Sequence, residues 1–228
     1  MDDRARRPAF LFDLDGTLVD SVYQHVIAWQ EALAEVGIGL SVWRIHRRIG
    51  MSGGLFLNAL QRETGVILDH DILTRLTTAH ADRYLEHSRS VVPLPGAPEL
   101  LHYLGERAVP FGIATSGYAR TAMPAIAKLG VPDDTVVITR DQVERAKPDP
   151  DLFLACAERL GVDPRHCFVV GDSIWDLLAA QRAGALGLGL LSGGYGRGEL
   201  QEAGAYRVYA DPQEMAEHLE EVGVRPPR

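Results

Sequence analysis

The sequence predicts an α/β fold, in which a doubly wound parallel sheet forms the core and an all-helical domain is inserted after the first strand. The first observation is that short apolar runs alternate with helical patterns after residue 94. Strands that alternate with helices are typical of a parallel sheet with helices on both faces. The second is that residues 22–92 show helical periodicity and no convincing strand, although an apolar run at 9–14 precedes them.

The expected core strands are short apolar runs, and residues 9–14 form the first of them, a buried strand with a glycine after it. Further strands are expected at 109–115, 135–139, 166–171 and 186–191. Helical patterns alternate with them at 97–107, 119–129, 150–160, 174–183 and 212–222. Because the first strand belongs to the same sheet, the core is expected to comprise residues 1–20 and 94–228.

The inserted segment, residues 21–93, is expected to be helical throughout. From Ser21 to Gly37 apolar side chains recur at three- and four-residue steps, and Gly37 is a typical helix stop. Two further helical patterns cover 53–65 and 69–88. The stretch VPLPGAPEL, with its three prolines and a glycine, then breaks the chain and returns it to the core.

Composition narrows the class of protein. The hydrophobic share of 46% is ordinary for a globular chain, and the net charge of −8 argues against non-specific binding to nucleic acid or anionic membranes. The cluster Arg4, Arg6 and Arg7 is short, so it is interpreted as a frayed terminus and not as a binding arm. No long apolar stretch follows it, so neither a signal peptide nor a membrane span is expected. Cys156 and Cys167 fit no zinc pattern, so we expect two buried free thiols and a cytoplasmic protein.

The segments that follow the expected strands contain acids, hydroxyls and one lysine. These residues are Asp13 and Asp15, Thr115 and Ser116, Lys147, and Asp172 and Asp176. Ligands of open parallel sheets bind beyond the carboxyl ends of the strands. Carboxylates that converge there indicate a shared hard cation, with Mg²⁺ expected because it prefers oxygen ligands. The lysine and the threonine hydroxyl are donors suited to an anion, and phosphate is the natural candidate.

Each segment taken alone also has a structural interpretation. An Asp-X-Asp-Gly sequence after a strand is often only a turn, and Thr115 could cap the following helix. The sequence KPDP suits a helix start, and the two acids of GDSIWD suit a helix N-terminus. Only the ordered set of four segments is specific.

This ordered set resembles the motifs of the haloacid dehalogenase-like hydrolase superfamily, whose members are mostly phosphatases. DLDGT at 13–17 is similar to the first motif, and Thr115 in FGIATS to the second. Lys147 in KPDP is similar to the third motif, and GDSIWD at 171–176 to the fourth. The segment 21–93 resembles the helical cap of the phosphoglycolate phosphatase and β-phosphoglucomutase branch. The resemblance covers essentially the whole chain and implies a Rossmann-like core.

The resemblance implies a phosphatase that acts on a small phosphorylated metabolite. Asp13 would be the nucleophile and form an aspartyl-phosphate. Asp15 would protonate the leaving alkoxide and then activate water. Thr115 and Ser116 would hold phosphoryl oxygens, and Lys147 would offset their charge.

The resemblance also implies the ligands of the cation. Asp13, the main-chain carbonyl of Asp15, and Asp172 would bind Mg²⁺. Asp176 would orient either metal-bound water or Lys147. No nucleic acid or membrane is expected as a partner, and the protein is expected to be a monomer or a dimer.

The helical segment is expected to choose the substrate and to exclude water. The candidate residues are His25, Arg48, Ser52 and Gly53. His25 lies where the first helix leaves the core, and a histidine on the helix surface is the alternative interpretation. The turn RRIGMSGG contains the other three and could dip towards the site, although its arginines also suit a solvated face.

Two other functions stay open at this stage. One is a sugar phosphomutase of the same superfamily, because His25 resembles a position used in the β-phosphoglucomutase branch. Gly53, however, stands where such mutases resemble one another in placing an arginine, and this departure favours a phosphatase. The other is a non-enzymatic phospho-acceptor module phosphorylated on Asp13, but a receiver-like domain lacks both the large insert and the acid at Asp15.

Overall fold

The computed structural model describes residues 8–224, so the terminal arginines Arg4, Arg6 and Arg7 lie outside the described residues. A six-stranded parallel sheet forms the core, in the order β3-β2-β1-β4-β5-β6. The strands are β1 (Ala9–Phe12), β2 (Phe111–Ala114), β3 (Val136–Ile138), β4 (Cys167–Gly171), β5 (Leu186–Leu190) and β6 (Ala205–Tyr209). Because β1 lies between β2 and β4, the strand order reverses beside β1, which is where ligands of such sheets bind.

Helices cover both faces of the sheet, and alternate side chains of β1 show why. Phe10 and Phe12 point into an apolar cluster under α5, α6 and α10, whereas Ala9 and Leu11 point into a second cluster under α7 and α8. The flanking helices are α5 (Ala97–Glu106), α6 (Ala119–Ile126), α7 (Asp151–Leu160), α8 (Ile174–Ala183), α9 (Arg197–Glu202) and α10 (Pro212–Glu217). Burial of β1 on both sides explains its uninterrupted apolar sequence.

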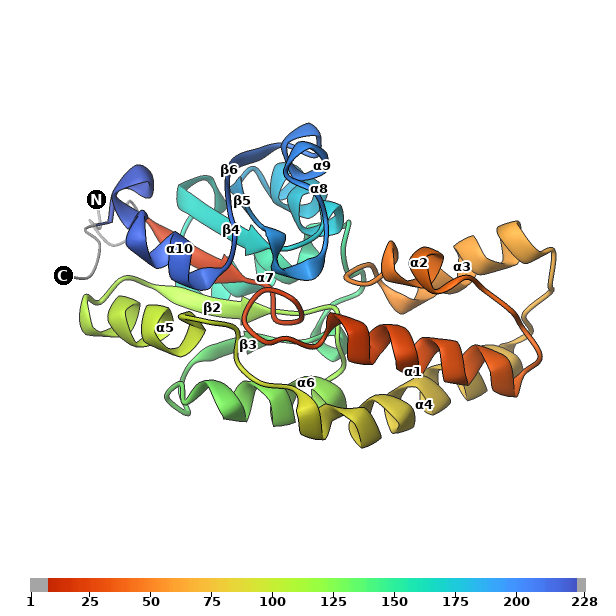
Figure 1. The fold of residues 1–228 in the computed structure, drawn as a ribbon. Coiled ribbons are helices and arrows are strands. Elements are labelled where there is room, and N and C mark those ends of the chain that lie inside the picture. The colour runs from red at the N-terminus through yellow and green to blue at the C-terminus, as the bar shows by residue number, and fades with distance from the viewer. Residues whose placement is uncertain (1–7, 225–228) are drawn as a thin grey trace.

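Four helices between β1 and α5 form a separate body beside the sheet, which we call the helical insert (Figure 1). They are α1 (Val22–Glu35), α2 (Val42–His46), α3 (Gly53–Thr64) and α4 (His70–His87). The insert has an apolar cluster of its own, centred on Trp29, Leu33 and Leu60. Ser52 and Asp69 begin α3 and α4 by accepting hydrogen bonds from main-chain N–H groups of the first turn.

The predicted fold class is confirmed, but four elements differ from expectation. The strand β6 was not predicted because its sequence, AYRVY, carries the exposed Arg207 and is not an apolar run. The short helices α2 and α9 were not predicted either. The helix expected at 212–222 ends at Glu217 and continues as a 3₁₀ turn at Leu219–Val222.

Two smaller expectations concern the cysteines and membranes. Cys156 and Cys167 are buried and free, as expected. Among residues 8–224, no helix combines the length and the apolar character needed to cross a membrane.

Candidate active site

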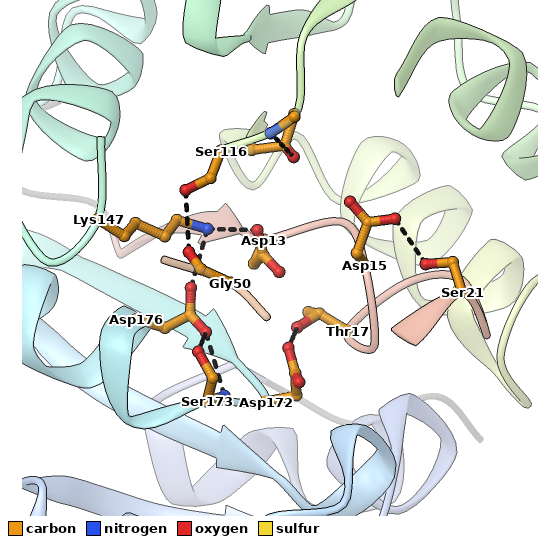
Figure 2. A network of polar contacts seen from close by, with 12 residues as sticks. Asp13, Asp15, Thr17, Ser21, Gly50, Ser116, Lys147, Asp172, Ser173 and Asp176 are labelled. Atoms are coloured by element: carbon orange, nitrogen blue, oxygen red, sulfur yellow. Dashed lines mark hydrogen bonds and ion pairs between the residues drawn. The ribbon is translucent and has the colours of Figure 1, made fainter. Parts of the chain in front are cut away.

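The residues expected at the strand ends meet at the carboxyl edge of the sheet. Asp13 directly follows β1, Thr115 follows β2 and Asp172 follows β4, while Lys147 reaches the same point from the loop before α7. All four side chains are buried, and the ammonium of Lys147 lies between Asp13 and Asp176 (Figure 2).

Lys147 is held by two carboxylates. Its Nζ bonds to Asp13 Oδ1 and lies 2.8 Å from Asp176 Oδ1. The other oxygen of Asp176 accepts hydrogen bonds from the main-chain N–H and the hydroxyl of Ser173, at 3.1 and 2.5 Å. Burial alone would lower the pKa of Lys147, but the two carboxylates outweigh burial and raise it. The side chain therefore stays an ammonium.

The carboxylates outnumber this single cation. Oxygens of Asp13, Asp172 and Asp176 all lie within 4.8 Å of one another. Burial raises the pKa of Asp13 to about 7, with Asp176 and Asp15 adding to the rise and Lys147 opposing it. Burial, reinforced by Asp176 and Asp13, also raises the pKa of Asp172 well above its usual range. Buried like charges that lack counter-charge fit a divalent cation with a preference for oxygen ligands.

Asp172 is fixed by its neighbours in one position. Its Oδ1 accepts a hydrogen bond of 3.1 Å from the Thr17 hydroxyl. Gly16 has a φ of +81°, and a Cβ there would lie 2.7 Å from Asp172 Oδ2. A Cβ on Gly193 would overlap the same carboxylate. The loops after β1 and β5 thus enclose Asp172 so closely that only glycine fits at these two positions.

The enclosure of Asp172 can be tested with Gly193→Ala, whose added methyl group must displace the carboxylate. If the carboxylate cluster binds Mg²⁺, we expect the Mg²⁺ concentration needed for half-maximal occupancy of the site to rise by roughly 10–100-fold, as when supports of metal ligands are removed. Gly198→Ala is the matched control, because nothing lies within 4 Å of a Cβ at Gly198. An unchanged Mg²⁺ requirement in a folded Gly193→Ala protein would contradict a role of Asp172 as a metal ligand.

The side chain of Asp15 belongs to a different polar group. Its Oδ1 accepts a hydrogen bond of 2.5 Å from the Ser21 hydroxyl (Figure 2) and lies 3.1 Å from Nε2 of His25 on α1. Burial acts to raise the pKa of Asp15, but His25 and Ser21 outweigh it and lower the pKa. The other ring nitrogen of His25 lies 3.1 Å from Nε2 of His80. Asp15 is thus an ionised carboxylate tied to the insert, although it stands two residues from Asp13.

The insert closes over the site through its turn at 46–52. The Ser116 hydroxyl donates to the carbonyl of Gly50 at 3.0 Å, and the N–H of Ser52 donates to the carbonyl of Lys147 at 2.9 Å. Nearby, the Tyr195 hydroxyl donates to a carbonyl of the same turn at 2.8 Å.

The Thr115 hydroxyl accepts a hydrogen bond from the N–H of Gly117 at 3.0 Å. The expected phosphate-binding hydroxyls therefore lie at the junction of core and insert.

A cavity of about 650 Å³ lies between the insert and the core and is lined by residues of both. Asp13, Asp15, Thr115 and Ser116 line its core side. Of the four expected specificity residues, His25, Arg48 and Gly53 line the insert side. Ser52 is instead the N-cap of α3, where its hydroxyl accepts from the N–H of Leu55 at 3.3 Å.

Several residues of the site were not predicted. Thr17 and Ser21 lie inside the DLDGTLVDS stretch, so a search for hydroxyls beside its acids would have found them. Trp29 follows His25 by four positions on α1, so helical spacing could have placed the two on one face. His80 is different, because it lies on α4, 55 positions after His25, and no local pattern links these two histidines. His80 stacks on Trp29 with ring centroids 4.2 Å apart, and both line the cavity.

Comparison with known proteins decides the family. Residues 8–184 match the family described as haloacid dehalogenase-like hydrolase. The chain belongs to this family. It is 34% identical to validoxylamine A 7'-phosphate phosphatase of Streptomyces hygroscopicus subsp. limoneus, over 79% of this chain and 84% of that protein. It is 31% identical to phosphoglycolate phosphatase of Rhodospirillum rubrum, over 92% of this chain and 90% of that protein.

A solved structure shows the same fold over nearly the full length. The haloacid dehalogenase-like chain is 50% identical to a hydrolase from Pseudomonas syringae, with a TM-score of 0.92 over 95% of this chain and 99% of that chain. The family and the enzyme class expected from the motifs are therefore confirmed.

Proposed function

We propose that this hydrolase is a Mg²⁺-dependent phosphatase that hydrolyses a small-molecule phosphate monoester through an aspartyl-phosphate. The observation that carries the proposal is the position of Asp13. It lies at the reversal point of the sheet, beside Lys147 and two further carboxylates, and faces a cavity closed by the insert. The relatives named as phosphatases support this activity.

Asp13 is the nucleophile in this proposal. Its oxygen forms a bond to phosphorus while the bond from phosphorus to the ester oxygen breaks. Lys147, held by Asp176, stays close enough to offset charge on the phosphoryl oxygens. Thr115 and Ser116 hold these oxygens through hydroxyl and N–H groups.

Asp15 moves protons in both steps. His25 keeps Asp15 ionised in the resting site, and this is the form that takes a proton from water in the second step. Binding of a phosphate dianion brings a like charge close to Asp15 and raises its pKa. The protonated form can then donate to the leaving alkoxide.

The metal site in this proposal uses Asp13, Asp172 and the main-chain carbonyl of Asp15, while Asp176 is engaged by Lys147 and Ser173. Bound Mg²⁺ would reduce the repulsion between the phosphate dianion and the attacking carboxylate. The ligands are all oxygens, which is the donor type that this ion prefers.

We further propose that residues 21–93 act as a cap on a catalytic core of residues 1–20 and 94–228. The hydrogen bonds of the 46–52 turn to the core hold the insert over the cavity. A closed insert keeps bulk water out of the site during phosphoryl transfer and so strengthens the electrostatic interactions there.

Metal removal tests the proposed activity. Phosphate release should vanish in excess chelator and return when Mg²⁺ is added, because the buried carboxylates then regain their counter-charge. Ca²⁺ should inhibit, since its larger and looser coordination misplaces the nucleophile. Release of phosphate from monoesters is measured directly, and full activity in chelator would contradict the metal assignment.

A further inference from the structure

We propose that the alcohol part of the substrate is an uncharged, polyhydroxylated group of about sugar size and carries no carboxylate. This inference rests on the proposed phosphatase function and concerns the cavity beyond the phosphoryl group. Cavities of roughly 300–1,000 Å³ accommodate drug-sized ligands. At about 650 Å³, the cavity has room for an alcohol considerably larger than two carbons.

Two of the three arginines that line the cavity are engaged by acids. Arg48 bonds to Glu63 and donates to the carbonyl of Arg44 at 2.8 Å. Arg120 lies 2.6 Å from Asp82. Both arginines thus already have a carboxylate partner before any substrate enters.

The remaining cations are engaged as well. Arg140 donates to main-chain carbonyls of residues 143 and 144, at 2.5 and 3.1 Å. The chain has only two lysines. Lys147 is held at the phosphoryl site, and Lys128 donates to two carbonyls near the end of α4, outside the cavity.

The histidines do not supply a free positive charge either. His25 is paired with Asp15. Burial, with a contribution from His25, lowers the pKa of His80 well below its usual range, so His80 is neutral. Among the described residues, the cavity therefore offers a substrate carboxylate no uncommitted cation. Its lining also includes Asp141, whose carboxylate accepts hydrogen bonds from the N–H of Ala119 and the hydroxyl of Thr139, and a second carboxylate brought near this charge costs affinity.

The rest of the lining suits an uncharged sugar or polyol. Trp29, Phe56 and Leu57 supply apolar surface for C–H groups, and Asn58 and Thr78 supply uncharged polar groups for hydroxyls. Sites of this kind combine apolar walls with a few polar groups that fix the orientation of the ligand.

Two pairs of esters test the inference, because each pair differs only by a hydroxymethyl group against a carboxylate. They are sorbitol 6-phosphate with 6-phosphogluconate, and glycerol 3-phosphate with 3-phosphoglycerate of matching configuration. We expect kcat/KM to be at least about tenfold higher for the uncharged member of each pair. p-Nitrophenyl phosphate is the reference. If the protein cleaves it but prefers the carboxylates or shows ratios near one, the substrate inference is wrong. If no ester is cleaved, the proposed phosphatase function fails and the inference fails with it.

A cation added to the cavity should shift this preference. Gly53 lines the cavity, and nothing lies within 4 Å of a Cβ placed there. Gly53→Lys should reduce several-fold the ratio of kcat/KM for the uncharged ester to kcat/KM for the carboxylate ester. Gly53→Met adds similar bulk without charge and should leave this ratio unchanged. Equal ratios in the two variants, with p-nitrophenyl phosphate still cleaved by both, would count against the charge argument.

Discussion

Asp13→Asn is expected to reduce phosphate release to the level of a protein-free blank. An amide is a far weaker nucleophile than a carboxylate, so the phosphoryl group has no acceptor. Loss of a covalent nucleophile costs enzymes up to roughly 10⁶-fold in kcat. The variant should still fold, because Lys147 keeps its ion pair with Asp176 and one of the crowded carboxylate charges is gone.

The matched control for Asp13→Asn is Asp20→Asn. Asp20 lies in the same segment, its side chain is exposed, and the same atoms change. Phosphate release from p-nitrophenyl phosphate is the measurement, with thermal unfolding to confirm that both variants are folded. Turnover of a folded Asp13→Asn protein at even a tenth of the unmodified rate would exclude Asp13 as the nucleophile.

How well a strand can be predicted from the sequence depends on how completely the sheet buries it. Strands buried on both faces, such as β1 and β4, are continuous apolar runs and are recognisable without a structure. The edge strand β6 pairs with β5 alone among the described strands and is exposed over part of its length, so its sequence, AYRVY, includes the charged Arg207 and is not an apolar run. Strand order was also inaccessible, since it depends on how the helices cross over the sheet and not on any local run.

Site residues were predictable where a charged or hydroxyl side chain follows an expected strand. Asp13, Thr115, Lys147 and Asp172 were all placed at one edge from their position after apolar runs, and the structure brings them together. The cavity lining was not predictable in the same way. His80, for example, lies on α4 and reaches His25 only because α4 packs against α1, a contact between residues 55 positions apart.

The two acids of the first loop illustrate what only the structure can separate. Sequence places Asp13 and Asp15 two positions apart, which would suggest one shared environment. The structure gives Asp13 a raised pKa among buried carboxylates and Asp15 a lowered one beside His25. Pairs of titratable groups whose surroundings move their pKa values apart are typical of divided catalytic roles.

This separation predicts that Asp15→Asn fails differently from Asp13→Asn. The variant keeps its main-chain carbonyl and leaves Asp13 free to attack, so only proton transfer is lost. A positioned acid or base contributes roughly 10²–10⁴-fold, and esters with alkoxide leaving groups should lose this amount. An aryl ester needs less protonation of its leaving group and can still phosphorylate Asp13. The second step then lacks the base that activates water, so the aspartyl-phosphate should accumulate.

Mass spectrometry of intact protein after mixing with p-nitrophenyl phosphate measures this accumulation. We expect one added phosphoryl group in Asp15→Asn and none in Asp13→Asn or in the double variant. Ser21→Ala is the matched control, since it removes a hydrogen bond of 2.5 Å to the Asp15 carboxylate but leaves the proton-transferring group in place. Ser21→Ala should therefore turn over both ester classes without a trapped intermediate. Full activity of Asp15→Asn on alkyl and aryl esters alike would remove Asp15 from the mechanism, because a group that transfers protons in both steps cannot be lost without cost.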